Sequence, residues 1–266
     1  MKKKLLLTLI LLIILAGFFS YRVKIKNFVI DLTKPSMPTE VEFQQNNNDL
    51  QDPKPITDDQ TTNTAAYSQA VGYGNNVLPT TYNLNVPFTP QAPFAVWDET
   101  FKEACEEAAG LIVHYFYQGK TFTPQIAADE ILAMVDWQLN YFGGHFDLTA
   151  QQTAEMIKEY LGYDKVEVVD NPTIDEIKNH LFQQRPVIAP AAGRQLGNPY
   201  FRTPGPIYHM LVIKGYTEDK FITNDPGTKR GEDFLYDYQV IMEAMHDWNE
   251  SDILQGEKRI IVIYPN

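Results

Sequence analysis

The apolar residues that follow position 100 change their period along the chain. Between residues 103 and 185 they recur at the three- and four-residue spacing of amphipathic helices. Four helices are predicted in this half: Glu103 to Phe116, Thr123 toward Gly143, Thr149 to Gly162, and Thr173 to the residue before Pro186.

Start signals precede these helices. Three of them fit a capping box, in which a threonine is followed three residues later by Glu or Gln. The pairs are Thr100 with Glu103, Thr149 with Gln152, and Thr173 with Glu176. The second helix instead opens at Pro124, directly after Thr123, which is a common first position for proline.

After Pro186 the pattern becomes that of strands. Continuous or alternating apolar runs predict strands, and the short spacing between two of them predicts a hairpin. The expected strands are Val187–Ala191, Tyr208–Tyr216, Phe221–Asn224 and Arg259–Tyr264, with an earlier one at Val166–Val169 and a late helix around Tyr238 to Met245. Helices first and an antiparallel sheet second predict the α+β class, with an N-terminal helical part packed on a C-terminal sheet.

The N-terminus has the pattern of an export signal. Three lysines precede an apolar run from Leu5 to Phe19, and basic residues follow it without an A-x-A cleavage site. A cleaved signal peptide and an uncleaved membrane anchor over residues 1–26 are both compatible with this pattern. Either one predicts a domain outside the cytoplasm, membrane-anchored or secreted.

Residues 27–82 differ in composition from the rest of the chain. Pro, Thr, Gln and Asn dominate there, and little apolar periodicity is present. Such a segment buries too little surface to offset the entropy lost on ordering. We therefore expect a disordered tether over 27–82 and a folded domain over 83–266.

Charge limits the partners of the folded part. Residues 1–86 carry 8 basic and 7 acidic residues, whereas residues 87–266 carry 14 and 27, a net charge of −13. An acidic domain repels nucleic acid and anionic lipid at long range. We expect a peptide or protein partner, no nucleic acid, and membrane contact through the N-terminal segment only.

Cys105 is the one cysteine in the chain. A disulfide within the chain and a cysteine-based metal cluster are therefore excluded. The pairs His145/Asp147 and His246/Asp247 are too sparse for a zinc site, so no metal and no cofactor are expected. A lone cysteine in an exported protein is a liability through oxidation, and catalysis would explain it. The alternative is a small core residue.

A cysteine nucleophile needs a base, and one of the five histidines is best placed to provide it. His209 opens the apolar strand HMLVIKGY directly after a Gly/Pro-rich loop. Asp225 ends the second strand of the expected hairpin, so it should lie near His209 and orient its ring. Asp225 in the sequence NDPG is also a good turn residue, and the two roles are compatible. Gln91 could donate a side-chain amide to an oxyanion, with the backbone N–H of Cys105.

These residues are embedded in blocks of sequence that resemble a known family. The blocks are NVPFTPQAPF, ACEEAA, PGPIYHMLVIKGY and FITNDPGTKRGE, in this order over residues 83–264. They are similar to papain-like cysteine peptidases, and more closely to the bacteriocin-processing, double-glycine leader peptidases and their stand-alone relatives. The resemblance implies a papain-like fold and thiol-dependent peptide hydrolysis. Its implied site is Cys105 as nucleophile, His209 as base, Asp225 as orienter and Gln91 as oxyanion donor.

The chain departs from that family at two points. Glu106 and Glu107 follow the cysteine where leader peptidases commonly have glycine, and Gln91 lies unusually far upstream. Acidic first turns are usual in helices, so Glu103, Glu106 and Glu107 receive no catalytic role here. Two other functions stay open: a cell-wall peptide hydrolase of the NlpC kind, and a non-catalytic peptide-binding module with the same fold.

Overall fold

The structure, a computed structural model, describes residues 36–45 and 78–266. The chain divides into two compact units, Met1–Met37 and Pro38–Asn266, and the second contains all the elements described below. The predicted signal or anchor over 1–26 and most of the predicted tether lie outside the described residues. Within the two described ranges, every helix is too short or too polar to span a bilayer.

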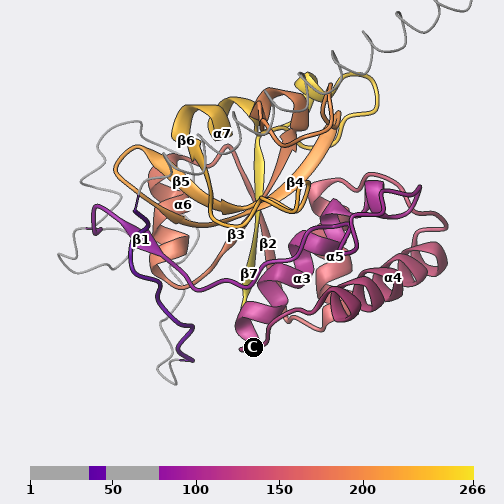
Figure 1. Ribbon diagram of the computed structural model, residues 1–266, viewed down its shortest axis with the longest axis horizontal. Helices are drawn as coiled ribbons and strands as arrows, with labels where there is room; N and C mark the ends of the chain where they lie inside the picture. The colour runs from indigo at the N-terminus through magenta and orange to yellow at the C-terminus, as the bar shows by residue number, and fades with distance from the viewer. Residues whose placement is uncertain (1–35, 46–77) are drawn as a thin grey trace, which may run out of the picture. The chain divides into compact units, whose positions relative to one another are not determined.

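The first half of the folded unit is helical, as the periodicity predicts. Two helices, α4 and α5, pack beside α3, and α6 follows after a single strand (Figure 1). A last helix, α7, follows the final hairpin. The helices are α3 (Cys105–Tyr117), α4 (Pro124–Tyr141), α5 (Ala150–Leu161), α6 (Ile174–Phe182) and α7 (Tyr238–Ala244), with short 3₁₀ turns at Phe101–Glu103, Gly193–Leu196 and Ile253–Gln255.

The strands of the described residues form one antiparallel sheet in the order β2-β7-β3-β4-β5-β6, and β1 pairs with β4 off this path. This arrangement confirms the predicted α+β class. Two of the strands, β1 and β6, were not expected from the sequence. The strands are β1 (Tyr82–Asn83), β2 (Lys165–Asp170), β3 (Val187–Ala192), β4 (Tyr208–Tyr216), β5 (Lys220–Asn224), β6 (Phe234–Asp237) and β7 (Arg259–Tyr264).

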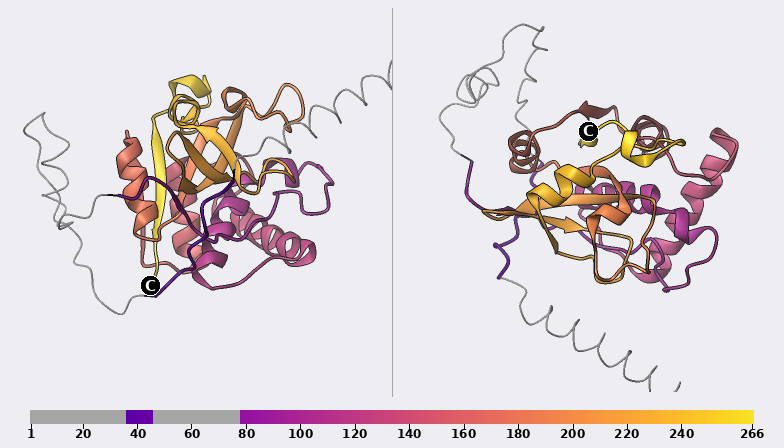
Figure 2. Two further views of the ribbon diagram at one scale, coloured as in Figure 1. Left: turned by 60° about the vertical axis from the view of Figure 1, so that its left-hand side comes forward. Right: turned by 90° about the horizontal axis from the view of Figure 1, so that it is seen from above.

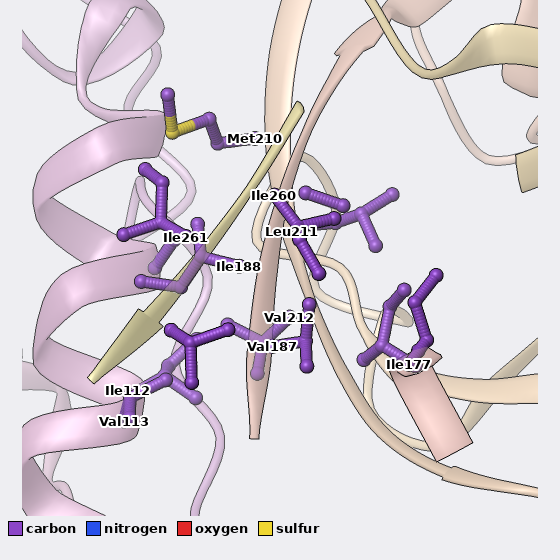
Figure 3. Packing of buried hydrophobic residues seen from close by; sticks show 14 of the residues in the cluster. Ile112, Val113, Ile177, Val187, Ile188, Met210, Leu211, Val212, Ile260 and Ile261 are labelled. Atoms are coloured by element: carbon purple, nitrogen blue, oxygen red, sulfur yellow. The ribbon is translucent and has the colours of Figure 1, made fainter. Parts of the chain in front are cut away.

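The core lies on both faces of the central strands. Figure 3 shows Met210, Ile188 and Ile261 on the side of α3, whereas Leu211 and Ile260 lie toward α6. Successive residues of a strand point to opposite faces, so strands covered on both sides become continuously apolar. This explains why β4 is buried along its whole length. The two further views in Figure 2 show helices on both sides of the sheet.

Three of the four predicted helix starts have the expected caps. Thr149 with Gln152 and Thr173 with Glu176 form complete capping boxes, and the side chain of Thr123 accepts from the backbone of Ile126. The prediction of a capping box at Thr100 was wrong. Thr100 has helical backbone angles and caps nothing, because residues 101–103 form a separate 3₁₀ turn.

Helix α3 therefore begins two residues later than predicted, at Cys105 itself. No side chain caps this helix, whose N-cap is Ala104. The first N–H groups of a helix lack intrahelical acceptors, and the helix dipole is strongest there. Cys105 thus lies in the first turn, where the dipole favours a thiolate, rather than in the second turn.

A piece of the expected tether packs on the domain. Residues 38–45, which we call the strap, run beside β1, with Val41 bridging Leu84 in parallel. Glu40 forms an ion pair of 2.6 Å with the buried Lys214, and Phe43 packs on the ring of Phe116. The prediction of disorder up to residue 82 therefore differs from the structure over the strap, because these few residues find apolar and charged partners.

Candidate active site

A cavity of about 720 Å³ opens where the start of α3 meets the start of β4. Cys105, His209 and Gln91 all line it. The loop between β3 and β4 forms one wall, from Tyr200 to Ile207, and the segment Gly227–Lys229 forms another. Three of the four predicted site residues therefore share one cavity, although His209 lies 104 residues after Cys105 in the sequence.

Cys105 is 3 % exposed, and its thiol donates a hydrogen bond of 3.0 Å to Oε2 of Glu106. Burial raises the pKa of the Cys105 thiol well above its usual value, and the carboxylates of Glu106 and Asp147 raise it further. A backbone hydrogen bond with Met210 acts in the opposite direction. Met210 directly follows His209, so the sulfur lies against the strand that carries the histidine.

His209 and Asp225 form the pair that the hairpin geometry predicts. Nε2 of His209 lies 2.8 Å from Oδ1 of Asp225, and both side chains are almost fully buried. A carboxylate only accepts, so Nε2 carries the proton and Nδ1 of the neutral ring is left as the basic nitrogen. The ring of Phe201 packs edge-on against His209 with centroids 5.3 Å apart, which holds the imidazole at the cavity wall.

The carboxylate of Asp225 accepts four hydrogen bonds. Oδ1 accepts from His209 and from the backbone N–H of Gly227 at 3.0 Å. Oδ2 accepts from Nδ2 of Asn198 at 2.9 Å and from the hydroxyl of Tyr236 at 2.6 Å. Burial by itself raises the pKa of Asp225, but His209, Tyr236 and Asn198 outweigh it, so the pKa is lowered. The buried carboxylate is therefore charged and fixed in place.

Asn198 and Tyr236 were missed by the sequence analysis. Asn198 lies in the Gly/Pro-rich loop, where asparagine is an ordinary turn residue. Tyr236 lies in β6, and the alternation of Phe234, Tyr236 and Tyr238 is a two-residue period that could have revealed this strand. The hydrogen bond between Asn198 and Tyr236, at 2.8 Å, closes the network behind Asp225.

Gln91 lines the cavity, but its amide is engaged elsewhere. Nε2 donates to the carbonyl oxygens of Phe101 and Lys102, both at 3.0 Å. Both partners are acceptors, which fixes which end of the amide is nitrogen. Oε1 is buried and has no hydrogen-bond partner. In this conformation, donation from Gln91 to an oxyanion requires the release of one of its two bonds.

Acidic residues gather on the α3 side of the cavity. Glu103 and Asp147 line it, and the buried Glu107 lies 3.1 Å from Nε2 of His145. That is an ion-pair distance, although the N–H is not aligned for a hydrogen bond. Burial lowers the pKa of His145, but the carboxylate of Glu107 outweighs it and the pKa is raised. Burial, together with the carboxylate of Glu103, raises the pKa of Asp147 to about 6.

The raised pKa of Asp147 predicts a pH dependence of stability. Asp147 holds its proton more tightly when folded, so between roughly pH 4 and pH 6 the unfolded chain releases it first and stability falls as pH rises. Replacing Asp147 by Asn should remove this loss and raise the free energy of unfolding at pH 7 by about 1 kcal/mol, after allowing for partial exposure.

Urea unfolding at pH 4 and pH 7 measures this effect. Asp136→Asn, on the exposed face of α4, is the matched control and should leave the pH dependence unchanged. If the free energy of unfolding of D147N changes between pH 4 and pH 7 as much as that of the wild type, Asp147 does not cause the pH dependence.

Among the described residues, no group of three or more His, Cys, Asp or Glu side chains is arranged to hold a metal ion. The cavity therefore offers a thiol, an imidazole paired with a carboxylate, and free N–H groups at a helix start. This set of groups can form and resolve a covalent bond to a carbonyl carbon.

Comparison with known proteins gives one family. The model of the Peptidase C39-like family matches residues 83–252, which is more than half of the chain and contains all four predicted site residues. A crystal structure of a proposed C39-like peptidase from Bacillus anthracis is similar over 68% of this chain and 96% of that chain, with 15% identity and a TM-score of 0.46. Among curated proteins none matches the chain.

Proposed function

Because this chain belongs to the Peptidase C39-like family, we propose that it hydrolyses peptide bonds through a Cys-His-Asp triad of Cys105, His209 and Asp225. Membership of the family indicates a cysteine peptidase. The assignment of these three residues as its catalytic triad is the more specific part of the proposal. The observation that carries it is the 2.8 Å pair of His209 and Asp225 beside the cavity that Cys105 also lines.

The first half of the reaction forms a thioester. The thiol proton moves from Sγ of Cys105 to Nδ1 of His209, and the thiolate attacks the carbonyl carbon of the peptide. The backbone N–H of Cys105, free at the start of α3, donates to the oxyanion. Gln91 is the proposed second donor, once Nε2 leaves one of its two carbonyl partners. The imidazolium then gives its proton to the leaving amine.

The second half releases the product. His209, neutral again, takes a proton from water, and the hydroxide attacks the thioester carbon. Collapse of the second tetrahedral intermediate breaks the C–S bond and returns the proton to sulfur. Asp225 stays ionised throughout and stabilises the imidazolium that forms twice.

The proposal extends to fold and location. A helical part that includes the nucleophile helix, packed on an antiparallel sheet that carries His and Asp, supports a papain-like fold. The basic and apolar N-terminus supports an exported or membrane-anchored protein with a peptide or protein substrate outside the cytoplasm. An aspartate at position 225, held by four donors, favours a peptidase over the NlpC-type cell-wall hydrolase, which usually has a second histidine there.

An activity-based thiol probe tests this function. The wild-type protein should be labelled at its single cysteine by a peptide-based probe that enters the cavity, and it should cleave a mixture of unstructured polypeptides. His209→Ala should slow labelling by at least about tenfold, because the thiol then lacks its base. Phe146→Ala, an exposed side chain outside the cavity, serves as control. Equal labelling of wild type and H209A would refute the role of His209.

A further inference from the structure

Glu106 is a carboxylic acid with no contact to bulk solvent. It is 1 % exposed and lies in the first turn of α3 beside the proposed nucleophile. Oε1 accepts a hydrogen bond of 2.9 Å from the backbone N–H of Leu148, and Oε2 accepts from the thiol of Cys105 at 3.0 Å. A buried carboxyl group is costly unless its polar atoms have fixed hydrogen-bond partners. The contact with Cys105 is thus one of two that hold the group.

This contact competes with the proposed chemistry. A thiol has one hydrogen, and the 3.0 Å distance from Sγ to Oε2 of Glu106 fits donation of that hydrogen to the carboxyl group. Nε2 of His209 is taken by Asp225, which leaves Nδ1 as the ring atom for the thiol proton. Formation of the thiolate–imidazolium pair therefore requires the hydrogen to leave Glu106 first.

We propose that Glu106 is a positioning residue that holds the proton of Cys105 in the free enzyme, so that the thiolate forms only when this hydrogen bond is released. The inference rests on the proposed function, because it names the group that controls the same nucleophile. On release, the S–H bond breaks, an N–H bond forms at Nδ1 of His209, and the electron pair stays on sulfur. Glu106 keeps its bond to Leu148.

The surroundings of the pair add to this restraint. Burial raises the pKa of Glu106 well above its usual value, and the neighbouring Glu107 and Asp147 raise it further, so the thiol and the carboxyl group compete for protons in one acidic pocket. Other titratable groups lie around the pair: Lys102 and Glu103 from the 3₁₀ turn, Glu107 from α3, Asp147 from the loop before α5, and Tyr208 and His209 from β4. His145 lies one step further away, against Glu107.

The test is Glu106→Gln in the full-length protein. The amide has the same shape, so its oxygen can accept from Leu148 while its NH₂ group donates to sulfur. This replaces the hydrogen-bond acceptor beside sulfur by a donor, which stabilises the thiolate. The pH midpoint of iodoacetamide alkylation should fall by about one unit. At pH 7 the rate should rise about threefold, since tenfold more thiolate is offset by its lower nucleophilicity.

Glu107→Gln is the matched control. Glu107 is the next residue on the same helix and is equally buried, but its contacts are Gln138 and His145 rather than sulfur. If any lost carboxyl group near Cys105 had this effect, the alkylation midpoints of E106Q and E107Q would fall equally. If the direct contact of Glu106 with the thiol is responsible, the midpoint of E106Q should fall much further. The proposal is overturned if E106Q keeps the wild-type midpoint, or if E107Q shifts it as far.

A second measurement uses the wild-type protein and does not depend on a variant that folds. Because Cys105 is the one thiol of the chain, its S–H stretching band in the infrared is unambiguous. At pH 7 the band should be present and lie below that of a free thiol in water. A missing band would mean that sulfur is already a thiolate and would refute the proposal. If alkylation shifts as expected but the wild type cleaves no peptide, the proposed function fails while the Glu106 contact stands.

Discussion

Replacing Cys105 by Ala is expected to lower peptide hydrolysis by at least about 10⁴-fold, because the attacking atom is lost and the remaining groups stabilise only the oxyanion. Covalent labelling by thiol reagents should vanish completely, since Cys105 is the single cysteine of the chain. The fold should persist. Alanine fits a helix start, but Oε2 of the buried Glu106 loses its partner, so the free energy of unfolding should fall by about 1–3 kcal/mol.

Initial rates on a peptide mixture, intact-mass analysis after iodoacetamide, and circular dichroism measure these three outcomes. Hydrolysis that survives in C105A at the wild-type rate would show that sulfur is not the nucleophile. A protein that loses activity together with its helical signal would leave the loss attributable to unfolding, and Cys105→Ser then serves as the milder replacement.

Asp225→Ala is expected to damage both stability and activity. The carboxylate is fully buried and accepts from four donors, so its removal leaves the N–H groups of His209 and Gly227 and the hydroxyl of Tyr236 without this acceptor. The amide of Asn198 loses one acceptor but can still donate to the hydroxyl of Tyr236. Each unsatisfied buried donor costs roughly 1–3 kcal/mol, which predicts a total loss of about 3–5 kcal/mol. Hydrolysis should fall about 10⁴-fold, because the His209 ring loses the group that fixes its tautomer.

Tyr236→Phe is the matched control for this variant. It removes one donor from the same carboxylate but leaves His209 its partner, so stability should fall by only about 1–2 kcal/mol and activity by less than tenfold. Urea unfolding at pH 7 and kcat/KM separate the two variants. Wild-type stability in D225A would contradict the role of the network.

The pH dependence of D225A follows from the lowered pKa of Asp225. A carboxyl group whose folded pKa is depressed contributes stability above its unfolded pKa, near 3.9, and loses that contribution as pH falls through the folded value. The electrostatic part of the difference between wild type and D225A should therefore be full at pH 7 and shrink in acid below about pH 4.

The order of helices and strands was predictable because the apolar residues follow an unambiguous helical spacing in the first half of the domain and an unambiguous strand pattern in the second. Capping threonines at 149 and 173 and a continuously apolar β4 leave little ambiguity about where those elements lie. The start of α3 was not predictable in the same way. Thr100 and Glu103 have the spacing of a capping box, but a 3₁₀ turn absorbs these residues, and the helix starts after Ala104 without a cap.

The candidate site was predictable only where the chain makes a simple turn. A tight connection between β4 and β5 brings Asp225 back to His209, and pairing of Val212 with Asn224 sets that register. The hydrogen-bond donors to Oδ2 of Asp225 come from Asn198 and Tyr236. Their positions depend on a long loop and on a strand that the sequence analysis did not predict. The contact between Cys105 and Glu106 depends on the position of Leu148, which no local spacing indicates.

The strap closes a long loop. Val41 lies beside Leu84, so the intervening chain of about forty residues returns to its own starting point. Closing a loop of that length costs about 3 kcal/mol in chain entropy. The bridge, the ion pair of Glu40 with Lys214 and the ring contacts of Phe43 together must exceed this cost. Since the penalty varies with the logarithm of length, each halving of the connection lowers it by only about 0.6 kcal/mol, so the strap's hold on the domain is nearly independent of spacer length.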